Sequence, residues 1–343
     1  QKFLEKYSIP YEIHSQQKGR ENIIIRIGEG DKKLFSAGHI DIVPVGDLET
    51  WDHPPLEGHI EGTKMYGRGT TDNKGPLVAL LMTAKALWPF RDELNGTFIA
   101  AGVADEEKGS VYGTEFLMEE GLIDADWAII PDIGGNMMAI DVAEKGVLDL
   151  EILTKGISAH GSTPDRGVNA IEKMAEVIEI LREHTFSFDE HNFLSPPTMN
   201  IGVVNGGSAS NMVPDKCRLI VNVRYLPSQK AENIKNELAL ALASVKDTEI
   251  SIIHNLNPTE VDPENILVGT IQEETKRVTS KTPQLIGLGG ATVCKTFIEK
   301  GIPAVGWSPG PDDVAHIANE YIDLDEILDF SKIMAGVVKR LLK

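Results

Sequence analysis

Two hydrophobic patterns alternate in the first part of the chain. Short apolar runs at residues 34–40, 97–103 and 127–130 have the length of buried β-strands, and residues 76–87 between the first two have helical spacing. Strands that alternate with helices in this way are typical of a mostly parallel sheet covered on both faces. The pattern therefore predicts an α/β architecture for this part of the chain.

The pattern changes at about residue 146. Four segments alternate apolar and polar residues more evenly, which indicates longer strands: residues 147–154, 198–204, 217–225 and 248–254. Residues 168–184 and 229–244, interleaved with them, have strong helical periodicity. The resulting order, β-α-β-β-α-β, predicts a ferredoxin-like α+β module.

The first pattern returns after about residue 260. It predicts a helix that ends near residue 279, strands at residues 284–288 and 302–307, and a final helix from residue 324. We therefore expect one domain inserted into another. The outer domain, residues 1–145 and 260–343, has a mixed, mostly parallel sheet with helices on both faces, and the inserted domain spans residues 146–259.

Composition and charge narrow the classes of partner. The chain has 343 residues, of which 41% are hydrophobic and 25% charged, as in globular proteins. Its formal net charge of −19 argues against nucleic acid and anionic membranes as partners, because these surfaces repel an acidic chain. No apolar run approaches the ~20 residues of a membrane helix. We expect Cys217 and Cys294 to be thiols in a reducing compartment, the cytoplasm.

Five polar clusters follow the carboxyl ends of predicted strands, where open α/β sheets bind ligands. They are His39 with Asp41, Asp72, Asp105 with Glu106 and Glu107, Asp132, and His316. Singly, each has an ordinary explanation: a core histidine, a turn carboxylate, a solvated loop, a helix cap and a surface histidine. Together, two imidazoles and several carboxylates at one sheet edge favour a divalent cation such as zinc.

Seven segments carry a resemblance to a known family. In order they are "GHIDIVPVGD", "YGRGTTDNKG", "DEEKGS", "SAHGSTPDRGVNAI", "NMVPDKCRLIVNVRYLP", "GGATVCK" and "PGPDDVAHIANEYI". From about residue 22 to its last residue the chain resembles the acetylornithine deacetylase / succinyl-diaminopimelate desuccinylase / glutamate carboxypeptidase family of co-catalytic zinc hydrolases. The resemblance implies hydrolysis of the amide bond of a small N-acyl amino acid, or of a short peptide.

The resemblance also implies roles for individual residues, and a cofactor of two divalent metal ions per chain, zinc foremost and cobalt as an alternative. One ion would be held by His39 and Asp132, the other by Glu107 and His316, with Asp72 as the bridge. Asp41, two residues after His39 and therefore expected on the same face of the strand, would stand behind His39 and orient its ring. Glu106 would be the general base. The peptide bond between Asp72 and Asn73 would be cis.

The inserted domain would act as a lid and form a homodimer. The partner subunit's His160 would then donate a hydrogen bond to the oxyanion of the transition state. Five further residues would contact the substrate: Asn211, Arg224, Gly289, Gly290 and Lys295. The ordinary explanations are an exposed turn histidine for His160 and an outward-facing strand arginine for Arg224, and the surrounding match argues against the first.

Two residues depart from the family pattern. Val293 replaces the aspartate that usually follows "GGAT", which leaves the orientation of Lys295 open. Asp132 stands where the deacylase and glutamate carboxypeptidase branches usually have glutamate, and it resembles the aminopeptidase and dipeptidase branches instead. A deacylase, a carboxypeptidase or dipeptidase, and a non-catalytic relative therefore remain as hypotheses, although the intact ligand set and Glu106 argue against the last.

Two other motifs are discounted. "GWSPG" matches the pattern of a serine-hydrolase elbow, but Pro309 follows the serine and has no N–H for an oxyanion hole. "GRGTTD" begins like a dinucleotide-binding fingerprint but lacks its third glycine. Neither a serine hydrolase nor a nicotinamide dehydrogenase is expected.

Overall fold

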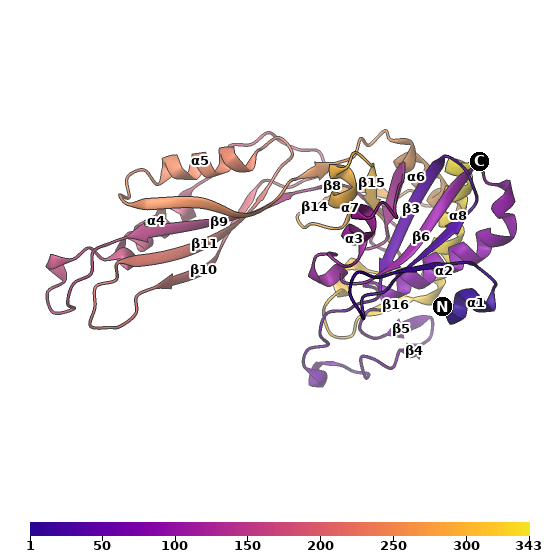
Figure 1. The fold of residues 1–343 in the computed structure, drawn as a ribbon, viewed down its shortest axis with the longest axis horizontal. Helices are drawn as coiled ribbons and strands as arrows, with labels where there is room; N and C mark the ends of the chain where they lie inside the picture. The colour runs from indigo at the N-terminus through magenta and orange to yellow at the C-terminus, as the bar shows by residue number, and fades with distance from the viewer. The chain divides into compact units, whose positions relative to one another are not determined.

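The structure is a computed structural model that describes all residues from Gln1 to Lys343. The chain divides into two compact units (Figure 1). The first unit comprises Gln1–Val142, Val261–Ile286 and Thr292–Lys343, and the second comprises Ala143–Glu260 and Gly287–Ala291. The short segment Gly287–Ala291 groups with the second unit, whereas the sequence pattern placed it in the outer domain.

The larger sheet has the strand order β1-β2-β6-β3-β7-β15-β8-β13, and β14 also pairs with β8. Its central strands are parallel, β6 with β3, β3 with β7 and β7 with β15, while β1, β2, β8 and β13 run antiparallel to their neighbours. This arrangement confirms the predicted fold class. The strands are β1 (Glu12–His14), β2 (Asn22–Ile27), β3 (Lys32–His39), β6 (Gly96–Val103), β7 (Trp127–Ile130), β8 (Ala139–Glu144), β13 (Thr259–Glu260), β14 (Gln284–Leu288) and β15 (Ala304–Gly306).

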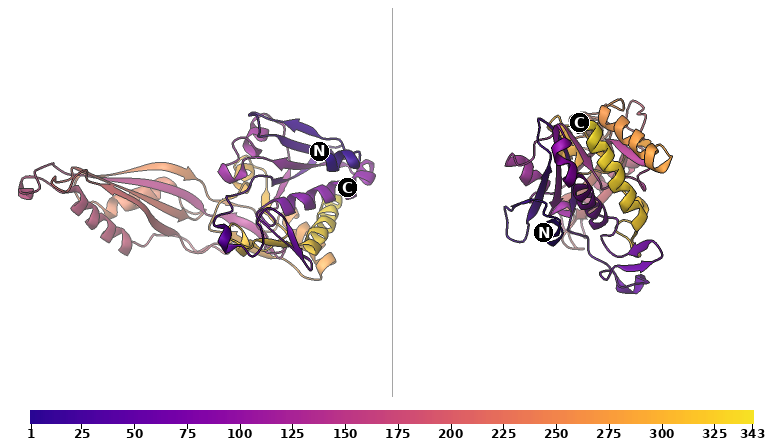
Figure 2. Two further views of the ribbon diagram at one scale, coloured as in Figure 1. Left: turned by 90° about the horizontal axis from the view of Figure 1, so that it is seen from below. Right: turned by 90° about the vertical axis from the view of Figure 1, so that its right-hand side faces the viewer.

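Helices cover both faces of this sheet, as its nearly continuous apolar strands require. On one face, α2 (Lys74–Leu87) and α8 (Leu324–Leu342) lie side by side against β3 and β6, and α6 (Ile266–Thr279) packs on α8 (Figures 1 and 2). On the other face, α3 (Thr114–Glu119) and α7 (Cys294–Glu299) contribute to an apolar cluster with Phe35 of β3. A short helix, α1 (Lys2–Lys6), begins the chain.

The last helix shows why these residues form a helix. The Asp323 side chain accepts a hydrogen bond from the Asp325 backbone N–H and caps the first turn, and Lys339 and Arg340 lie in the last turn, where positive charge is favoured. Along one side, its apolar residues are buried: Ile327, Phe330, Ile333, Met334, Val337, Val338, Leu341 and Leu342. The helix therefore anchors the C-terminal segment to the sheet.

A small three-stranded sheet, of order β16-β5-β4, lies beside the site described below. It is formed by β4 (His59–Glu61), β5 (Lys64–Tyr66) and β16 (Tyr321–Asp323). Its strands have only three residues each, too few for a distinct alternating pattern, so the hydrophobic pattern did not predict them. The sheet brings residues near position 66 next to residues near position 320.

The second unit has a four-stranded antiparallel sheet of order β10-β11-β9-β12. Its elements are β9 (Gly146–Lys155), α4 (Ala170–Glu183), β10 (Thr198–Gly206), β11 (Lys216–Tyr225), α5 (Ala231–Ala241) and β12 (Thr248–Leu256). Alternate residues of β11 are buried, from Cys217 to Tyr225, and they share one apolar cluster with residues of α4 and α5. The chain order of these elements is the β-α-β-β-α-β order of the sequence pattern.

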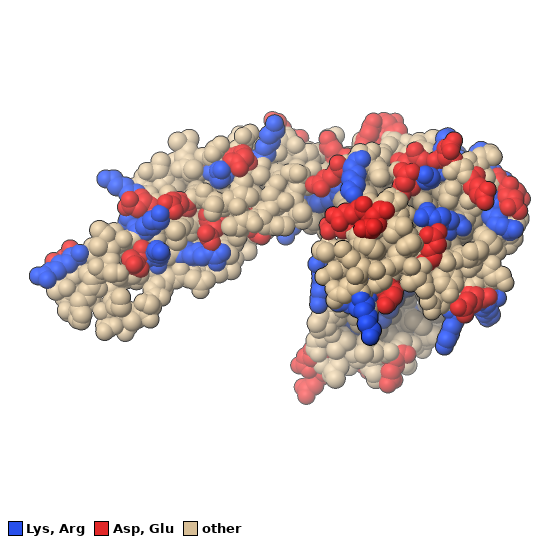
Figure 3. Space-filling model, viewed as in Figure 1, with Lys and Arg blue, Asp and Glu red and all other residues tan.

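Charged side chains of both signs are interspersed on the surface. On the face drawn in Figure 3, Asp and Glu lie among Lys and Arg over each unit. None of the helices combines the length and the hydropathy that crossing a membrane requires.

Candidate metal centre

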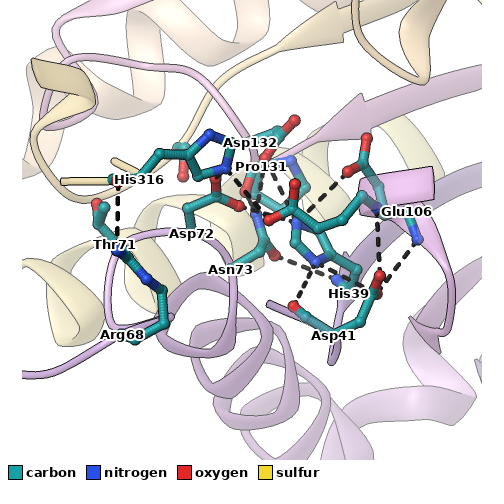
Figure 4. Close-up of polar contacts among 12 residues, drawn as sticks. His39, Asp41, Arg68, Thr71, Asp72, Asn73, Glu106, Pro131, Asp132 and His316 are labelled. Atoms are coloured by element: carbon teal, nitrogen blue, oxygen red, sulfur yellow. Dashed lines mark hydrogen bonds and ion pairs between the residues drawn. The ribbon is translucent and has the colours of Figure 1, made fainter. Parts of the chain in front are cut away.

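The candidate residues meet at the carboxyl edge of the parallel strands (Figure 4). His39 is the last residue of β3, Asp132 follows β7 by two residues, and Glu106 and Glu107 begin the short 3-10 helix after β6. These three strands are neighbours, so their carboxyl ends lie together. Asp72, just ahead of α2, and His316, between β15 and β16, complete the group.

The first cluster consists of His39, Asp72 and Asp132, whose ligand atoms all lie within 4.8 Å of one another. Nε2 of His39 is 2.9 Å from Oδ1 of Asp72 and 3.8 Å from Oδ1 of Asp132. Zinc binds nitrogen and oxygen at about 2.0–2.2 Å, so donor atoms roughly 3–4 Å apart can share one ion. The cluster has the spacing of a cation site.

The second cluster consists of Asp72, Glu107 and His316. Nε2 of His316 is 2.9 Å from Oδ2 of Asp72 and 3.2 Å from Oε1 of Glu107. The two oxygens of Asp72 thus face different histidines, Oδ1 toward His39 and Oδ2 toward His316. This is the arrangement of a carboxylate that bridges two cations.

Buried contacts around Asn73 fix the first cluster. The Asn73 amide donates to the backbone oxygen of Pro131 at 2.6 Å and accepts from the backbone N–H of His39 at 3.3 Å, so it ties the ends of β7 and β3 together. A Cβ on Gly38 would lie 2.7 Å from the Asn73 oxygen, so only glycine allows this close approach. The peptide bond between Asp72 and Asn73 is cis, as the resemblance implied.

The position of Asp41 differs from the one expected from the sequence. Strand β3 ends at His39, so Asp41 lies beyond it and does not share a strand face with that histidine. The closest acceptor to His39 Nδ1 is the backbone oxygen of Asp41, at 3.0 Å, and the carboxylate is 3.6 Å away. The carboxylate instead accepts from the backbone N–H groups of Glu106 and Glu107, at 3.2 Å each. Asp41 therefore contacts both the ring of His39 and the loop of the proposed base.

Glu106 lies at the edge of the first cluster, with Oε2 3.9 Å from His39 Nε2. Burial and the negative charge of Asp132 raise the pKa of Glu106 to about 8. Burial and Asp72 likewise raise the pKa of Glu107. Bound cations would act in the opposite direction, because positive charge favours the ionised carboxylates.

The charge balance of the site fits bound cations. Burial alone lowers the pKa of His39, but hydrogen bonds to Asp132, Asp41 and Asp72 outweigh burial and raise it. Carboxylates gathered this closely repel one another unless positive charge stands between them. Imidazole nitrogens with carboxylate oxygens are a donor set suited to zinc and similar ions. The residues present therefore fit two divalent cations.

Three buried polar residues at this site were missed by the sequence reasoning: Asn73, Arg68 and Glu320. All three lie inside the segments "YGRGTTDNKG" and "AHIANE" that carry the resemblance. Arg68 stands between two glycines, which was a local signal, whereas Asn73 and Glu320 have polar neighbours and were marked only by their place in these motifs.

The remaining candidates belong mostly to the second unit. His160 and Asn211 are brought together there, because the Gly161 N–H donates to the Asn211 carbonyl at 2.8 Å and His160 forms a β-bridge with Met212. Arg224, in β11, donates from Nε to the Asn222 side chain at 2.9 Å and lies near the Gly289 carbonyl. Gly289 and Gly290 are exposed in the segment that groups with this unit. Lys295 lies in α7 of the first unit and is buried.

Comparison with known proteins identifies the family and related sequences. A sequence profile of peptidase family M20/M25/M40 matches residues 35–340. A probable succinyl-diaminopimelate desuccinylase of Staphylococcus aureus is 29% identical, covering 99% of this chain and 91% of its own.

Two solved structures share the fold. An M20 family metallo-carboxypeptidase from Sulfolobus solfataricus has a TM-score of 0.76 at 22% identity, over 99% of this chain and 92% of its own. A dinuclear metal-binding peptidase from the M20 family of Bacillus subtilis has a TM-score of 0.75 at 18% identity, over 99% of this chain and 90% of its own. The likeness extends over both units of the chain.

Proposed function

The chain belongs to peptidase family M20/M25/M40, and from this premise we propose that it hydrolyses the amide bond of a small N-acyl amino acid, as deacetylases and desuccinylases do. The observation that supports this most is the placement of the two Asp72 oxygens against two separate histidines. A single bridging carboxylate between two donor clusters suits a dinuclear hydrolytic site. The resemblance to a desuccinylase supports the acyl-amino-acid substrate class.

The proposed ligands are His39 and Asp132 for one cation, Glu107 and His316 for the other, and Asp72 for both. Zinc is the expected metal, with cobalt as an alternative. When bound, the two cations would polarise the amide carbonyl and lower the pKa of a water molecule.

Glu106 is the proposed general base. It would take a proton from the attacking water and deliver it to the nitrogen of the leaving amine. Glu106 and Glu107 are successive residues whose backbone N–H groups are both held by Asp41. Adjacent side chains diverge, so Glu107 can face a cation while Glu106 faces the water.

The roles of the second unit rest on the resemblance. The partner subunit's His160 would donate to the developing oxyanion, and Asn211 and Arg224 would bind the carboxylate or acyl group of the substrate. Gly289, Gly290 and Lys295 would complete substrate binding. The role of the partner subunit's His160 requires a homodimer, which we propose forms through the inserted lid.

A carboxypeptidase or dipeptidase activity of the same site is the second candidate. Asp132 favours a dipeptidase in particular, because it replaces the glutamate usual in the deacylase and glutamate carboxypeptidase branches. Both activities would use the same ligands and the same base. They differ only in what the substrate carries on the acyl side of the amide.

A substrate panel separates the two candidates. Protein loaded with zinc or cobalt is incubated with N-acetyl-, N-succinyl- and N-aminoacyl-amino acids, and the free amino acid released is quantified. Faster hydrolysis of the N-acetyl or N-succinyl compounds supports the proposal, whereas preference for dipeptides supports the second candidate. No release from any of the three classes, by protein that holds both cations, would overturn both.

A further inference from the structure

A buried ion pair joins the two segments that carry Asp72 and His316. Nη1 of Arg68 is 2.7 Å from Oε2 of Glu320, and both side chains are inaccessible, with 3% of Arg68 exposed and none of Glu320. Removing two charges from water is costly, and a buried pair is therefore weak support for stability by itself. Both side chains also form hydrogen bonds to the backbone near the candidate ligands, and these contacts suggest another role.

Glu320 holds the backbone of the bridging residue. Its second oxygen, Oε1, accepts from the backbone N–H groups of Thr71 at 2.9 Å and Asp72 at 3.1 Å. Both carboxylate oxygens of Glu320 are thus used, one on Arg68 and one on the amides. Charge-assisted hydrogen bonds of this kind are short and directional, so they fix where the Asp72 side chain begins.

Arg68 holds the backbone of the histidine loop. Nη2 donates to the His316 carbonyl at 3.2 Å (Figure 4). Nη1 also donates to the Ile317 carbonyl at 3.1 Å. The guanidinium lies 5.2 Å from the centre of the Trp51 ring, which restricts its orientation further. The rigid fork of arginine spans both carbonyls and the carboxylate, a geometry that a single ammonium group does not reproduce.

His316 needs this support more than His39 does. The His39 side chain is only 3% exposed, so packing holds its ring, whereas the His316 side chain is 51% exposed. His316 also has a φ of 66°, a left-handed conformation that non-glycine residues rarely adopt without strong constraints. The position of its ring therefore depends on its backbone, and the hydrogen bond from Arg68 to its carbonyl is one of the constraints.

We propose that Arg68 and Glu320 are positioning residues that set the affinity for the second cation, the one held by Asp72, Glu107 and His316. They do so by fixing the backbone of His316, which belongs to that cluster alone, relative to the backbone of Asp72. This inference rests on the ligands of the proposed function. It assigns the pair to cation binding at one of the two clusters and not to folding in general.

Arg68→Lys tests the proposal with little change in charge. Lysine keeps the positive charge beside Glu320 but cannot reach the carbonyls of both His316 and Ile317. The backbone of His316 is therefore held less firmly. Changes to groups that orient metal ligands typically weaken metal binding by 10–100-fold. We expect a loss of about this size for one cation and a change below about threefold for the other, measured by competition with a chromophoric chelator. The visible spectrum of cobalt-loaded protein should lose the contribution of one ion.

Glu320→Asp is the second variant, because it keeps the carboxylate but shortens the side chain that bridges Arg68 and the two amides. Glu274→Asp is the matched control. Glu274 is 7% exposed and pairs with Arg277 at 2.7 Å and Arg340 at 3.3 Å, between helices away from the candidate ligands. The control should bind both cations as the wild type does.

Two results would overturn the proposal. One is unchanged affinity for both cations in Arg68→Lys and Glu320→Asp, with only the melting temperature lowered as in the control. The other is failure of both variants to fold, which would make the pair a requirement for folding. A wild-type chain that binds fewer than two cations would refute the proposed metal centre itself, and is thereby distinguishable from either result.

Discussion

Asp72 is the residue on which both clusters depend, since each of its oxygens faces a different histidine. We predict that Asp72→Ala loses most of both cations, because no other candidate ligand is common to the two clusters. Elemental analysis after metal loading and desalting should approach two divalent ions per wild-type chain and fall toward none in the variant. Retention of one tightly held ion in Asp72→Ala would contradict the bridging role.

Glu106 is not needed to hold either cluster together. We predict that Glu106→Gln binds both cations and the substrate nearly as the wild type does but turns over about 10²–10⁴-fold more slowly, because a general base typically contributes that much. Metal content, KM and kcat measured together check this. Turnover near the wild-type rate would exclude Glu106 as the base and revive the hypothesis of a non-catalytic relative.

At the scale of elements, the contact of β3 with the start of α2 holds the first cluster. A Cβ at Gly38 would lie 2.7 Å from the Asn73 side-chain oxygen and 2.8 Å from Cβ of Leu77. We predict that Gly38→Ala destabilises the chain by about 1–3 kcal/mol, since overpacking forces neighbouring groups to shift. The variant should also bind the cation at His39 with lower affinity, because Asn73 contacts both His39 and Asp132.

Denaturant unfolding and metal titration of Gly38→Ala measure the two effects. Gly269→Ala, in α6 with open space where a Cβ would be, is a suitable control and should not weaken metal binding. Wild-type stability in Gly38→Ala would show that α2 can move away from β3 without cost.

Periodicity predicted the elements whose patterns are long enough to be distinctive. The bounds of β7 and β14 match the predicted strands residue for residue, and α8 begins at the predicted Leu324. The three-residue strands β4, β5 and β16 have too few positions for an alternating pattern and lack the apolar run that marked the equally short β15. The pairing of Arg68 with Glu320 was not predictable either, because it joins residues 252 positions apart and depends on that small sheet.

The ligand set was predictable for a related reason. Each candidate follows a strand or precedes a helix whose own pattern is clear, and the carboxyl ends of parallel strands meet at one edge. Strand β3 ends at His39, one residue before the predicted end, so the expected shared strand face of His39 and Asp41 is not formed. Strand ends are set by hydrogen bonds to neighbours, which a single sequence does not specify.

For the whole molecule, the open prediction is that two chains share each site. We predict that His160→Ala lowers turnover by about 10²–10³-fold, as loss of an oxyanion donor typically does, while metal content is unchanged. Inactive Glu106→Ala and His160→Ala chains that are unfolded together and refolded as a mixture should regain activity. A mixed dimer would have one site with both changes and one with neither.

The controls for this experiment are each variant refolded alone. No recovery in a mixture with demonstrated mixed dimers would mean that His160 acts within its own chain or not at all. A strictly monomeric wild-type protein would also exclude the shared site.

The discontinuity of the first unit has a consequence for protein synthesis. The four strands of the second unit lie between residues 146 and 256, whereas β15, His316 and α8 of the first unit come later in the chain. Domains form as the chain emerges at about 5–20 residues per second, so roughly 15–55 s separate the synthesis of His39 from that of His316. During this interval the ribosome has delivered every proposed carboxylate ligand but not the second imidazole. A nascent chain that stalls between residues 256 and 316 therefore contains all four strands of the inserted unit's sheet and only one of the two candidate cation clusters.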